Sequence, residues 1–405
     1  MVFSQRLRHY SGSLIAPEPV MHIALTEEQA LIEDTARRFA ATELAPVAAQ
    51  VEHAEFRPVY LKNLKSLAEL GFMGLNVDPE YGGSGAGVVA FSVAVTEVAR
   101  ACASTAVAMS VNNMVAEVIQ AIGNEAQKRA YIERICNGDY PAAGFCLSEA
   151  GAGSDPSAMK TRALRDGDHY VLNGTKMWIS NAEYAGVFVV WAVTDGQAAP
   201  GKGISCFLVE AGTPGLSIGP HELKMGQRGS STNPVIFEDV RVPASAMLGR
   251  ENDGFRIAVG ELTGGRIGIG SLALGIGTAA IDIARRYVTE REQFGKRIGD
   301  FQGIQWMLAD TYTELEAARL LLMSAACQKE RGQTYAKAAS MAKLFATESA
   351  NKACYTALQL MGGVGYTEAM PLERLARDAR VTTIYEGTSE IQRVIIAREL
   401  LREVA

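Results

Sequence analysis

The chain has 405 residues, of which 48% are hydrophobic and 21% charged, and its formal net charge is -6 at pH 7. This length and composition allow a large core divided over two or three domains. Acidic and basic residues are interspersed, so no basic stripe indicates nucleic-acid binding. The longest apolar run, Val187 to Val193, is well short of the roughly 18 residues of a membrane-spanning helix, so we expect no membrane segment.

Cysteine and histidine give little support for a metal site. The six cysteines are scattered without a C-x-x-C pair, as expected for reduced, mostly buried thiols in an intracellular protein. All five histidines lie in the first 221 residues, so the histidines of a multi-histidine metal site or a Ser-His-Asp triad could come only from the N-terminal half. We therefore expect no metal and no disulfide framework.

Residues 1–21 differ in composition from the rest of the chain. They include Arg6 and Arg8 but no acidic residue before Glu18, which is typical of a short mitochondrial presequence. An upstream start codon misassigned ahead of Met21 explains them equally well. We treat them as a flexible extension or start-site artefact, favour a bacterial cytoplasmic protein, and keep the mitochondrial matrix as the alternative.

Residues 22–142 are predicted to form an N-terminal α-helical domain. Thr26 and Gln29 have the spacing of a capping box at the start of the first helix, and apolar residues follow at helical intervals. Further helices are expected at 60–70, 88–101, 105–122 and 125–136.

Residues 143–252 are predicted to form a central β domain. From Pro141 onward, short runs rich in Val, Ile, Phe and Tyr alternate with Gly, Asp and Asn. This pattern predicts an antiparallel sheet folded into a small barrel or sandwich. The expected strands are 144–148, 160–165, 170–172, 187–193, 204–209 and 235–242.

Residues 253–405 return to long helical segments, expected at 255–290, 301–331, 335–361 and 389–402. Four long helices with apolar stripes predict a bundle. The middle section is too short for an independent catalytic barrel, so the active site should lie where the domains meet.

Two segments suggest a ligand site. No phosphate-binding P-loop is present, and the glycines at 268–277 lie in a helical pattern, which argues against a Rossmann site. The glycine-rich loop at 145–155 follows an expected strand and either exposes backbone N–H groups to a ligand or forms a tight turn. Glu386 stands between an aromatic residue and a glycine. It is either a catalytic base or an acidic residue that is favoured by the dipole at the N-terminus of a helix capped by Thr388.

Together, five motifs resemble the acyl-CoA dehydrogenase family in order and spacing, from about residue 25 to 402. They are the loop at 145–155, Trp-Ile-Ser-Asn at 178–181, Arg-Glu-Gln-Phe-Gly at 291–295, Gln-Leu-Met-Gly-Gly-Val-Gly-Tyr at 359–366 and Tyr-Glu-Gly-Thr at 385–388. The chain is most similar to short-chain and short-branched-chain members. The resemblance implies an α+β, mostly α fold: an N-terminal helical domain, a central β-barrel domain and a C-terminal four-helix bundle. It also implies non-covalent FAD and a homo-oligomer, usually a tetramer.

By matching position, the resemblance implies roles in cofactor binding. Trp178 would pack on the isoalloxazine, and the Ser180 hydroxyl, where the family usually has threonine, would approach its N5. Without a flavin, Trp178 and Phe294 would be core aromatics and Arg291 a solvated charge. The full set of implied FAD contacts is Phe145, Leu147, Ser148, Trp178, Ile179, Ser180, Arg291, Gln293, Phe294, Gln302, Gln359, Gly362, Gly363, Thr388 and Glu390, with Gln359, Gly362 and Gly363 reaching the FAD of a neighbouring subunit.

The resemblance further implies the reaction. Glu386 matches the family's base, which would remove the α proton of a short, branched or medium acyl-CoA as hydride leaves the β carbon for flavin N5, giving the 2-enoyl-CoA. Electrons would pass to electron-transfer flavoprotein. Some branched-chain members carry the base at the position of Gly265, and Thr263 replaces a frequent aspartate. The implied substrate contacts are Ser154, Arg266, Tyr385 and Gly387.

Two other functions fit the same motifs. An acyl-CoA oxidase on the same scaffold would send the electrons to oxygen, and sequence separates it poorly because oxygen access depends on cavity shape. A non-catalytic subunit that binds acyl-CoA or flavin would keep the motifs for assembly alone. Both remain alternatives to the dehydrogenase at this stage.

Overall fold

The computed structural model describes residues 24–404. The expectations for residues 1–21 lie outside this range. The first element is helix α1 (Glu27–Phe39), which starts with the predicted capping box: the Gln29 N–H donates to Thr26 Oγ1 at 3.2 Å, and the Thr26 N–H donates to Gln29 Oε1 at 3.0 Å. A π-helical turn and short 3-10 turns follow. The remaining N-terminal helices begin within three residues of their predicted starts: α2 (Arg57–Glu69), α3 (Gly87–Ala101), α4 (Ala103–Ile122) and α5 (Glu125–Cys136).

The middle section is one sheet of seven strands in the order β1-β4-β2-β3-β7-β6, with β5 paired to β4. The predicted antiparallel pairing holds for β2–β3, β3–β7, β4–β5 and β6–β7 but was wrong for β4, which runs parallel to both β1 and β2. The chain leaves β1 through the β2–β3 hairpin before it returns as β4, so the first and fourth strands have the same direction. The strands are β1 (Ala142–Cys146), β2 (Arg162–Asp166), β3 (His169–Ser180), β4 (Ala185–Val193), β5 (Ile204–Glu210), β6 (Leu216–Ile218) and β7 (Thr232–Pro243).

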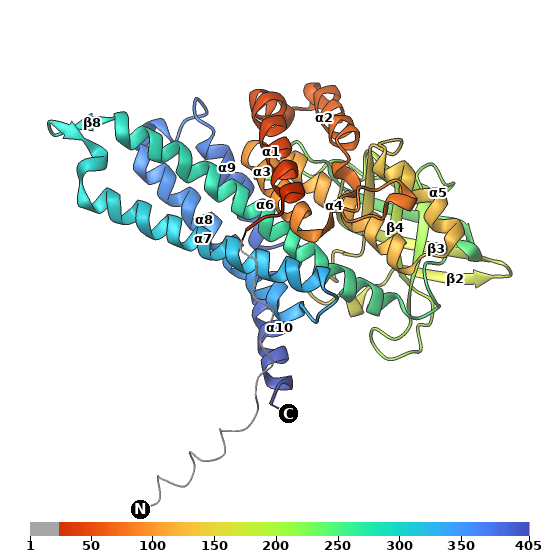
Figure 1. The fold of residues 1–405 in the computed structure, drawn as a ribbon. Coiled ribbons are helices and arrows are strands. Elements are labelled where there is room, and N and C mark those ends of the chain that lie inside the picture. The colour runs from red at the N-terminus through yellow and green to blue at the C-terminus, as the bar shows by residue number, and fades with distance from the viewer. Residues whose placement is uncertain (1–23, 405) are drawn as a thin grey trace, which may run out of the picture.

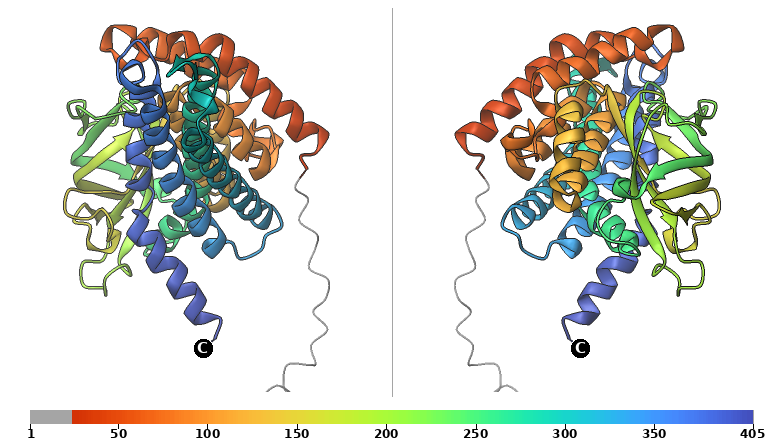
Figure 2. Two further views of the ribbon diagram at one scale, coloured as in Figure 1. Left: turned by 90° about the vertical axis from the view of Figure 1, so that its left-hand side faces the viewer. Right: turned by 90° about the vertical axis from the view of Figure 1, so that its right-hand side faces the viewer.

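The C-terminal section is a helical bundle with a small hairpin at one end (Figure 1). Its helices are α6 (Gly254–Glu290), α7 (Gln302–Glu330), α8 (Ala336–Met361), α9 (Leu372–Arg380) and α10 (Ser389–Arg402), and strands β8 (Glu292–Gln293) and β9 (Lys296–Arg297) join α6 to α7. Figure 2 shows the sheet covering one side of the helices and α10 projecting from the body.

Helix α6 is long and apolar enough to cross a membrane by length and composition, although no single uninterrupted apolar run in it is that long. However, 83% of its apolar window is buried inside the protein. A helix that is apolar on all sides is either a membrane span or the core of a large protein, and this burial assigns α6 to the core. It runs between the N-terminal helices and the rest of the bundle.

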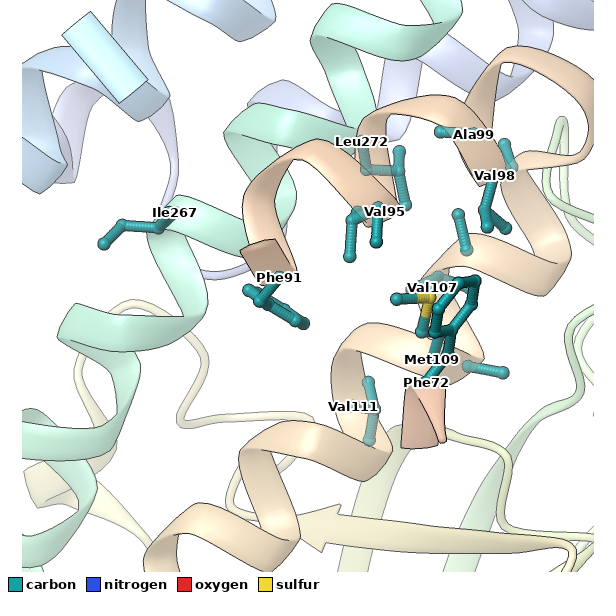
Figure 3. Close-up of a cluster of buried hydrophobic side chains, with 14 of the residues drawn as sticks. Phe72, Phe91, Val95, Val98, Ala99, Val107, Met109, Val111, Ile267 and Leu272 are labelled. Carbon is teal, nitrogen blue, oxygen red and sulfur yellow. The ribbon is translucent and has the colours of Figure 1, made fainter. Parts of the chain in front are cut away.

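The core around α6 combines bulky side chains with small ones. Phe91 and Val95 of α3, Val107 of α4 and Leu272 of α6 are buried together (Figure 3). Gly275 of α6 lies against the backbone of α3, where any Cβ would overlap a carbonyl oxygen. This close helix packing gives the two helical layers a fixed separation.

Candidate active site

Glu386 lies in the turn between α9 and α10, in a backbone conformation that non-glycine residues rarely adopt (φ 54°). Its Oε2 atom is buried without a hydrogen-bond partner. Helix α6 passes directly beside it at Gly265, where an added Cβ would lie 2.8 Å from Glu386 Oε2 and 3.0 Å from Met114 Sδ. Glycine at position 265 therefore makes room for this carboxyl group.

Burial raises the pKa of Glu386 from its ordinary 4.5 to about 7, although nearby Arg266 and Lys343 oppose the rise. Removing solvent disfavours the charged form of a carboxyl group, and the two cations only partly compensate. A carboxyl group with this pKa exchanges protons readily at neutral pH, which is the property of a general base.

Three side chains hold the turn that carries Glu386. Gln392 Nε2 donates to the carbonyl oxygens of Glu386 at 3.1 Å and Gly387 at 2.9 Å, and Lys343 Nζ donates to the Gly387 oxygen at 2.9 Å. Thr388 caps α10 by accepting the Ile391 N–H at 3.3 Å. A strained backbone persists only where its surroundings fix it, and these bonds do so here.

Arg266 lies next to this turn and is almost fully buried. Its NH1 atom reaches Thr263 Oγ1 at 3.4 Å and Ser340 Oγ at 3.5 Å, which are long contacts, and its Nε atom has no partner. Burial lowers the pKa of Arg266, although Glu386 acts in the opposite direction. A buried guanidinium with unused donors is suited to a ligand oxygen.

A second group of predicted residues lies on the sheet, where the end of β1 meets β3. Lys176 Nζ donates to the Leu147 oxygen at 3.1 Å, and the Met177 N–H donates to the Ser148 oxygen at 2.9 Å. The register of β3 against β7 shifts between Lys176 and Ile179, and Trp178 within the shift has φ 58°. Such a bulge turns a side chain outward. The Trp178 indole is accordingly 51% exposed, so it is not a core aromatic.

Comparisons with known proteins agree with this geometry. Sequence models of the N-terminal, middle and C-terminal domains of acyl-CoA dehydrogenases match residues 26–139, 144–240 and 252–401. The chain belongs to the acyl-CoA dehydrogenase family. It is 45% identical to the acryloyl-CoA reductase (NADH) of Anaerotignum propionicum, over 94% of this chain and 96% of that protein. It is 46% identical to the mitochondrial short-chain specific acyl-CoA dehydrogenase of Mus musculus, over 94% and 92%.

The solved structure of butyryl-CoA dehydrogenase from Megasphaera elsdenii has the same fold. It superimposes with a TM-score of 0.89 at 38% identity and covers 94% of this chain and 100% of that one. This acyl-CoA dehydrogenase is therefore a flavoprotein oxidoreductase, and FAD is the cofactor of its family. The predicted helical, sheet and helical organisation is confirmed.

The sheet residues of this acyl-CoA dehydrogenase fit a flavin ring. Trp178 offers an exposed flat aromatic surface, Ile179 beside it is buried, and Ser180 ends β3. Phe145 and Leu147 supply apolar surface, and Phe145 packs against Trp191 with ring centroids 4.3 Å apart. An exposed aromatic face bordered by a hydroxyl and apolar side chains is suited to a planar heterocycle.

Thr388 and Glu390 lie at the start of α10, and the seven remaining predicted cofactor residues form a separate group at the far end of the bundle. They lie on the β8–β9 hairpin, the start of α7 and the end of α8: Arg291, Gln293, Phe294, Gln302, Gln359, Gly362 and Gly363. Helix α6 has 37 residues and is about 55 Å long. Its first residue packs on β5 of the sheet and its last adjoins the hairpin, so this distal group lies opposite the sheet residues (Figure 1).

Phe294 in the distal group is 93% exposed, with φ 54°. It is therefore not the core aromatic that the sequence left open. Arg291, Gln359, Gly362 and Gly363 are likewise exposed. Within one chain the structure does not bring this group to the sheet, whereas Arg266, Tyr385 and Gly387 do lie around Glu386.

Sequence reasoning missed several polar residues that shape the site. The fully buried Lys176 pairs with Glu149 at 2.8 Å, and Glu149 also accepts the N–H groups of Lys160 and Thr161 at 2.7 and 2.9 Å. Burial alone would raise the pKa of Glu149, but Lys176 and these donors keep it below its usual value. The pair fixes the glycine-rich loop in which the exposed Ser154 lies.

Lys343 and Gln392 were also missed, and a signal for these two residues and for Lys176 was present in the sequence. Lys176 follows Tyr170 and Leu172 in the two-residue period of the buried face of β3, where a lysine is unusual. Lys343 stands in an apolar helical stretch between buried alanines, and Gln392 lies one turn into α10. Polar residues on an apolar face are the best sequence indication of buried hydrogen-bonding roles.

Proposed function

We propose that this chain is a short-chain acyl-CoA dehydrogenase that converts an acyl-CoA thioester to the 2-enoyl-CoA, with Glu386 as the base. The observation that carries the proposal is the Glu386 carboxyl group, which has a buried Oε2 without a partner and a pKa raised by burial to about 7. Burying a carboxyl oxygen that makes no hydrogen bond costs folding free energy and stabilises no other part of the fold. A role in proton transfer explains why it is buried.

Each residue around Glu386 has a distinct part in this proposal. Glu386 takes the α proton, and Gly265 keeps the space in which its carboxyl group moves. Arg266 and Lys343 stabilise the carboxylate form, and Arg266 also offers a donor to the thioester or the pantetheine. FAD, when bound, supplies the hydride acceptor. Tyr385 and Gly387 form the wall beside the thioester.

The packing beyond Gly265 favours a short acyl chain. One helical turn along α6, a Cβ at Gly268 would overlap Ser110 Oγ and lie 3.2 Å from Phe91 Cζ. Because one turn of helix rises about 5.4 Å, the space beside α6 closes within a few carbon atoms of Glu386. A butyryl-sized chain therefore fits better than a long one, and short branched or medium chains are the neighbouring possibilities.

We further propose that the working form is a homo-oligomer, as a tetramer by resemblance, in which one copy completes the FAD site of another. The separation of the sheet residues from the distal group supports this, since one chain cannot offer both groups to one FAD. Trp306 and Tyr355 of the bundle are also largely exposed, and exposed aromatic residues are typical of interfaces. Gel filtration with FAD quantification tests it: a monomer with stoichiometric tight FAD would contradict it.

The electron acceptor and the direction of the reaction form the second part of the proposal. By resemblance, electron-transfer flavoprotein takes the electrons. The similarity to an acryloyl-CoA reductase makes reduction of a short enoyl-CoA the second candidate, in which Glu386 in its protonated form returns a proton to the α carbon. The same residues serve both directions, so the acceptor and the potential decide between them.

The decisive experiment is an anaerobic titration of the FAD-loaded protein with straight and branched acyl-CoAs from C4 to C16, following the oxidised flavin absorbance. We expect bleaching by butyryl-CoA and its close analogues and none in Glu386→Gln. Fast reoxidation of the bleached protein by air would favour an oxidase. No bleaching by any acyl-CoA, with FAD bound, would refute the dehydrogenase and favour a binding subunit.

A further inference from the structure

Gln227 connects the middle section to the segment that carries Glu386. It lies in the loop before β7, is 4% exposed, and has a left-handed backbone (φ 48°). Its Nε2 atom donates to the Tyr385 hydroxyl at 3.0 Å and to the Asp378 carbonyl oxygen at 3.2 Å, and its backbone N–H donates to the Asp378 carboxylate. One glutamine therefore holds the residue that directly precedes Glu386.

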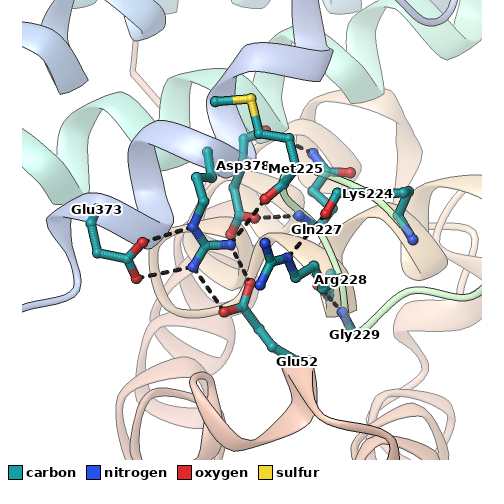
Figure 4. A network of polar contacts seen from close by, with 10 residues as sticks. Glu52, Lys224, Met225, Gln227, Arg228, Gly229, Glu373 and Asp378 are labelled. Atoms are coloured by element: carbon teal, nitrogen blue, oxygen red, sulfur yellow. Dashed lines mark hydrogen bonds and ion pairs between the residues drawn. The ribbon is translucent and has the colours of Figure 1, made fainter. Parts of the chain in front are cut away.

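The loop around Gln227 is anchored to two other parts of the chain. Arg377 binds Glu52 of the N-terminal section at 2.8 and 2.9 Å, Glu373 of α9 at 2.7 and 2.9 Å, and the Met225 oxygen at 3.1 Å (Figure 4). Gly226 lies directly on the Arg377 backbone, where any Cβ would overlap it. These contacts fix the backbone of the loop that carries Gln227, so its side chain can hold Tyr385 in one position.

The other end of the same loop is bonded to the sheet residues. The Asn181 N–H donates to the Ser231 oxygen at 2.9 Å, and within the loop Lys224 Nζ donates to the Ser230 oxygen at 2.8 Å. Asn181 directly follows Ser180, at the end of the bulged strand β3. Residues 227–231 thus span the distance from Tyr385, beside Glu386, to the strand that carries Trp178.

We propose that Gln227 is a positioning residue that acts through Tyr385 to set the Glu386 carboxyl group relative to Trp178 and Ser180. This inference rests on the proposed function. Removal of hydrogens from two adjacent carbons requires the base and the hydride acceptor at a defined separation across the Cα–Cβ bond. A misplacement of about 1 Å can slow such a step about 100-fold. The loop from Gln227 to Ser231 directly connects the segment that carries Glu386 to strand β3, which carries Trp178 and Ser180.

The test uses the FAD-loaded holoenzyme with Gln227→Met, Tyr385→Phe and the double variant. Methionine keeps the volume of Gln227 and removes its amide, and phenylalanine removes only the hydroxyl. Tyr131→Phe, which removes a partly buried hydroxyl on helix α5 that makes no hydrogen bond within residues 24–404, is the matched control. Three quantities are measured: the rate constant of flavin reduction at saturating butyryl-CoA, the dissociation constant of butyryl-CoA, and amide hydrogen exchange in the peptide spanning 379–392.

We expect each single variant to lower the reduction rate constant roughly 10- to 100-fold and to leave the dissociation constant within about threefold. The double variant should be no slower than the slower single variant, because both remove the same contact. Amide exchange near residue 386 should quicken in both variants and stay unchanged in Tyr131→Phe.

Wild-type rates in both single variants, or multiplicative losses in the double variant, would overturn the proposal. Equal losses of rate and of butyryl-CoA affinity would also overturn it, because they would indicate a general structural role. If Gln227→Met binds no FAD, Tyr385→Phe decides alone. Failure of the wild-type enzyme to be reduced by any acyl-CoA would refute the proposed function instead, and the exchange measurement would still report on the Gln227–Tyr385 contact.

Discussion

Replacing Glu386 with glutamine should abolish flavin reduction and also make the folded protein more stable above neutral pH. The carboxyl group has no hydrogen bond at Oε2, and burial raises its pKa to about 7. A carboxyl group whose pKa is higher in the folded than in the unfolded state favours folding fully below about pH 4.5, and that contribution is lost as the pH rises through 7. The wild type therefore carries a cost at pH 9 that glutamine lacks.

The size of this cost follows from the pKa. A rise from 4.5 to about 7 corresponds to about 3 kcal/mol at 1.36 kcal/mol per pH unit. Glutamine also leaves Arg266 and Lys343 buried without a nearby anion, which offsets part of the gain. We therefore expect a net stabilisation of about 1–2 kcal/mol at pH 9, which is a rise of roughly 1–2 °C in Tm for a chain of this size.

The assay is thermal unfolding of the FAD-loaded wild type and Glu386→Gln at pH 6 and pH 9, at equal protein concentration. Glu238→Gln, an exposed glutamate of β7, is the control for removing a negative charge. The variant's advantage over the wild type should be larger at pH 9 than at pH 6. An advantage that is equal at both pH values, or absent at pH 9, would refute the reasoning that this carboxyl group is desolvated.

In the wild type, the second-order rate constant for flavin reduction by acyl-CoA should rise as the pH increases through about 7, because only the carboxylate form of Glu386 accepts a proton. A rate constant that stays flat from pH 5.5 to 8.5 would contradict this. Gly265→Ala places a Cβ 2.8 Å from Glu386 Oε2 and should slow reduction at least about tenfold at unchanged FAD content, and an undiminished rate would refute the contact. Lys343→Met removes a cation that lowers the pKa of Glu386, so the midpoint of the pH profile should move upward rather than stay or fall. Lys176→Met leaves Glu149 buried and unpaired and should cost about 3–5 kcal/mol in unfolding measurements, with Glu149→Gln in the same chain restoring part of it.

The helices were predictable because most are long and amphipathic or have clear caps. Helices α5 and α10 start at the predicted residues, since Asn124 and Thr388 are strong N-caps. Helix α9 was missed because it has only nine residues, although its buried Leu372, Leu375 and Ala379 recur at helical spacing. Strand β3 was predicted at 170–172 but extends to Ser180, because its second half places Lys176 on the buried face and contains a bulge.

The parallel pairing of β1 with β4 could not be derived from the sequence, since composition gives the strands but not their order. The same limit applies to the site. Glu386 could be proposed as the base from sequence because its motif is local, whereas Gly265 was considered only as the position of an alternative base and not as the residue that makes room for Glu386. Gln227 was not, because it meets Tyr385 across 158 residues of sequence and its amide resembles that of any loop glutamine.

The arrangement around Glu386 explains why its supports come from several segments. A desolvated carboxyl group and a left-handed backbone each cost folding free energy, on the order of 1–3 kcal/mol for the backbone. A single neighbouring turn cannot offset both. Lys343 from α8, Gln392 from α10 and Gln227 from the loop before β7 each bond the turn from a different direction. Because three separate side chains provide these bonds, losing one should loosen the turn that carries Glu386 without unfolding the protein, and activity should fall before stability does.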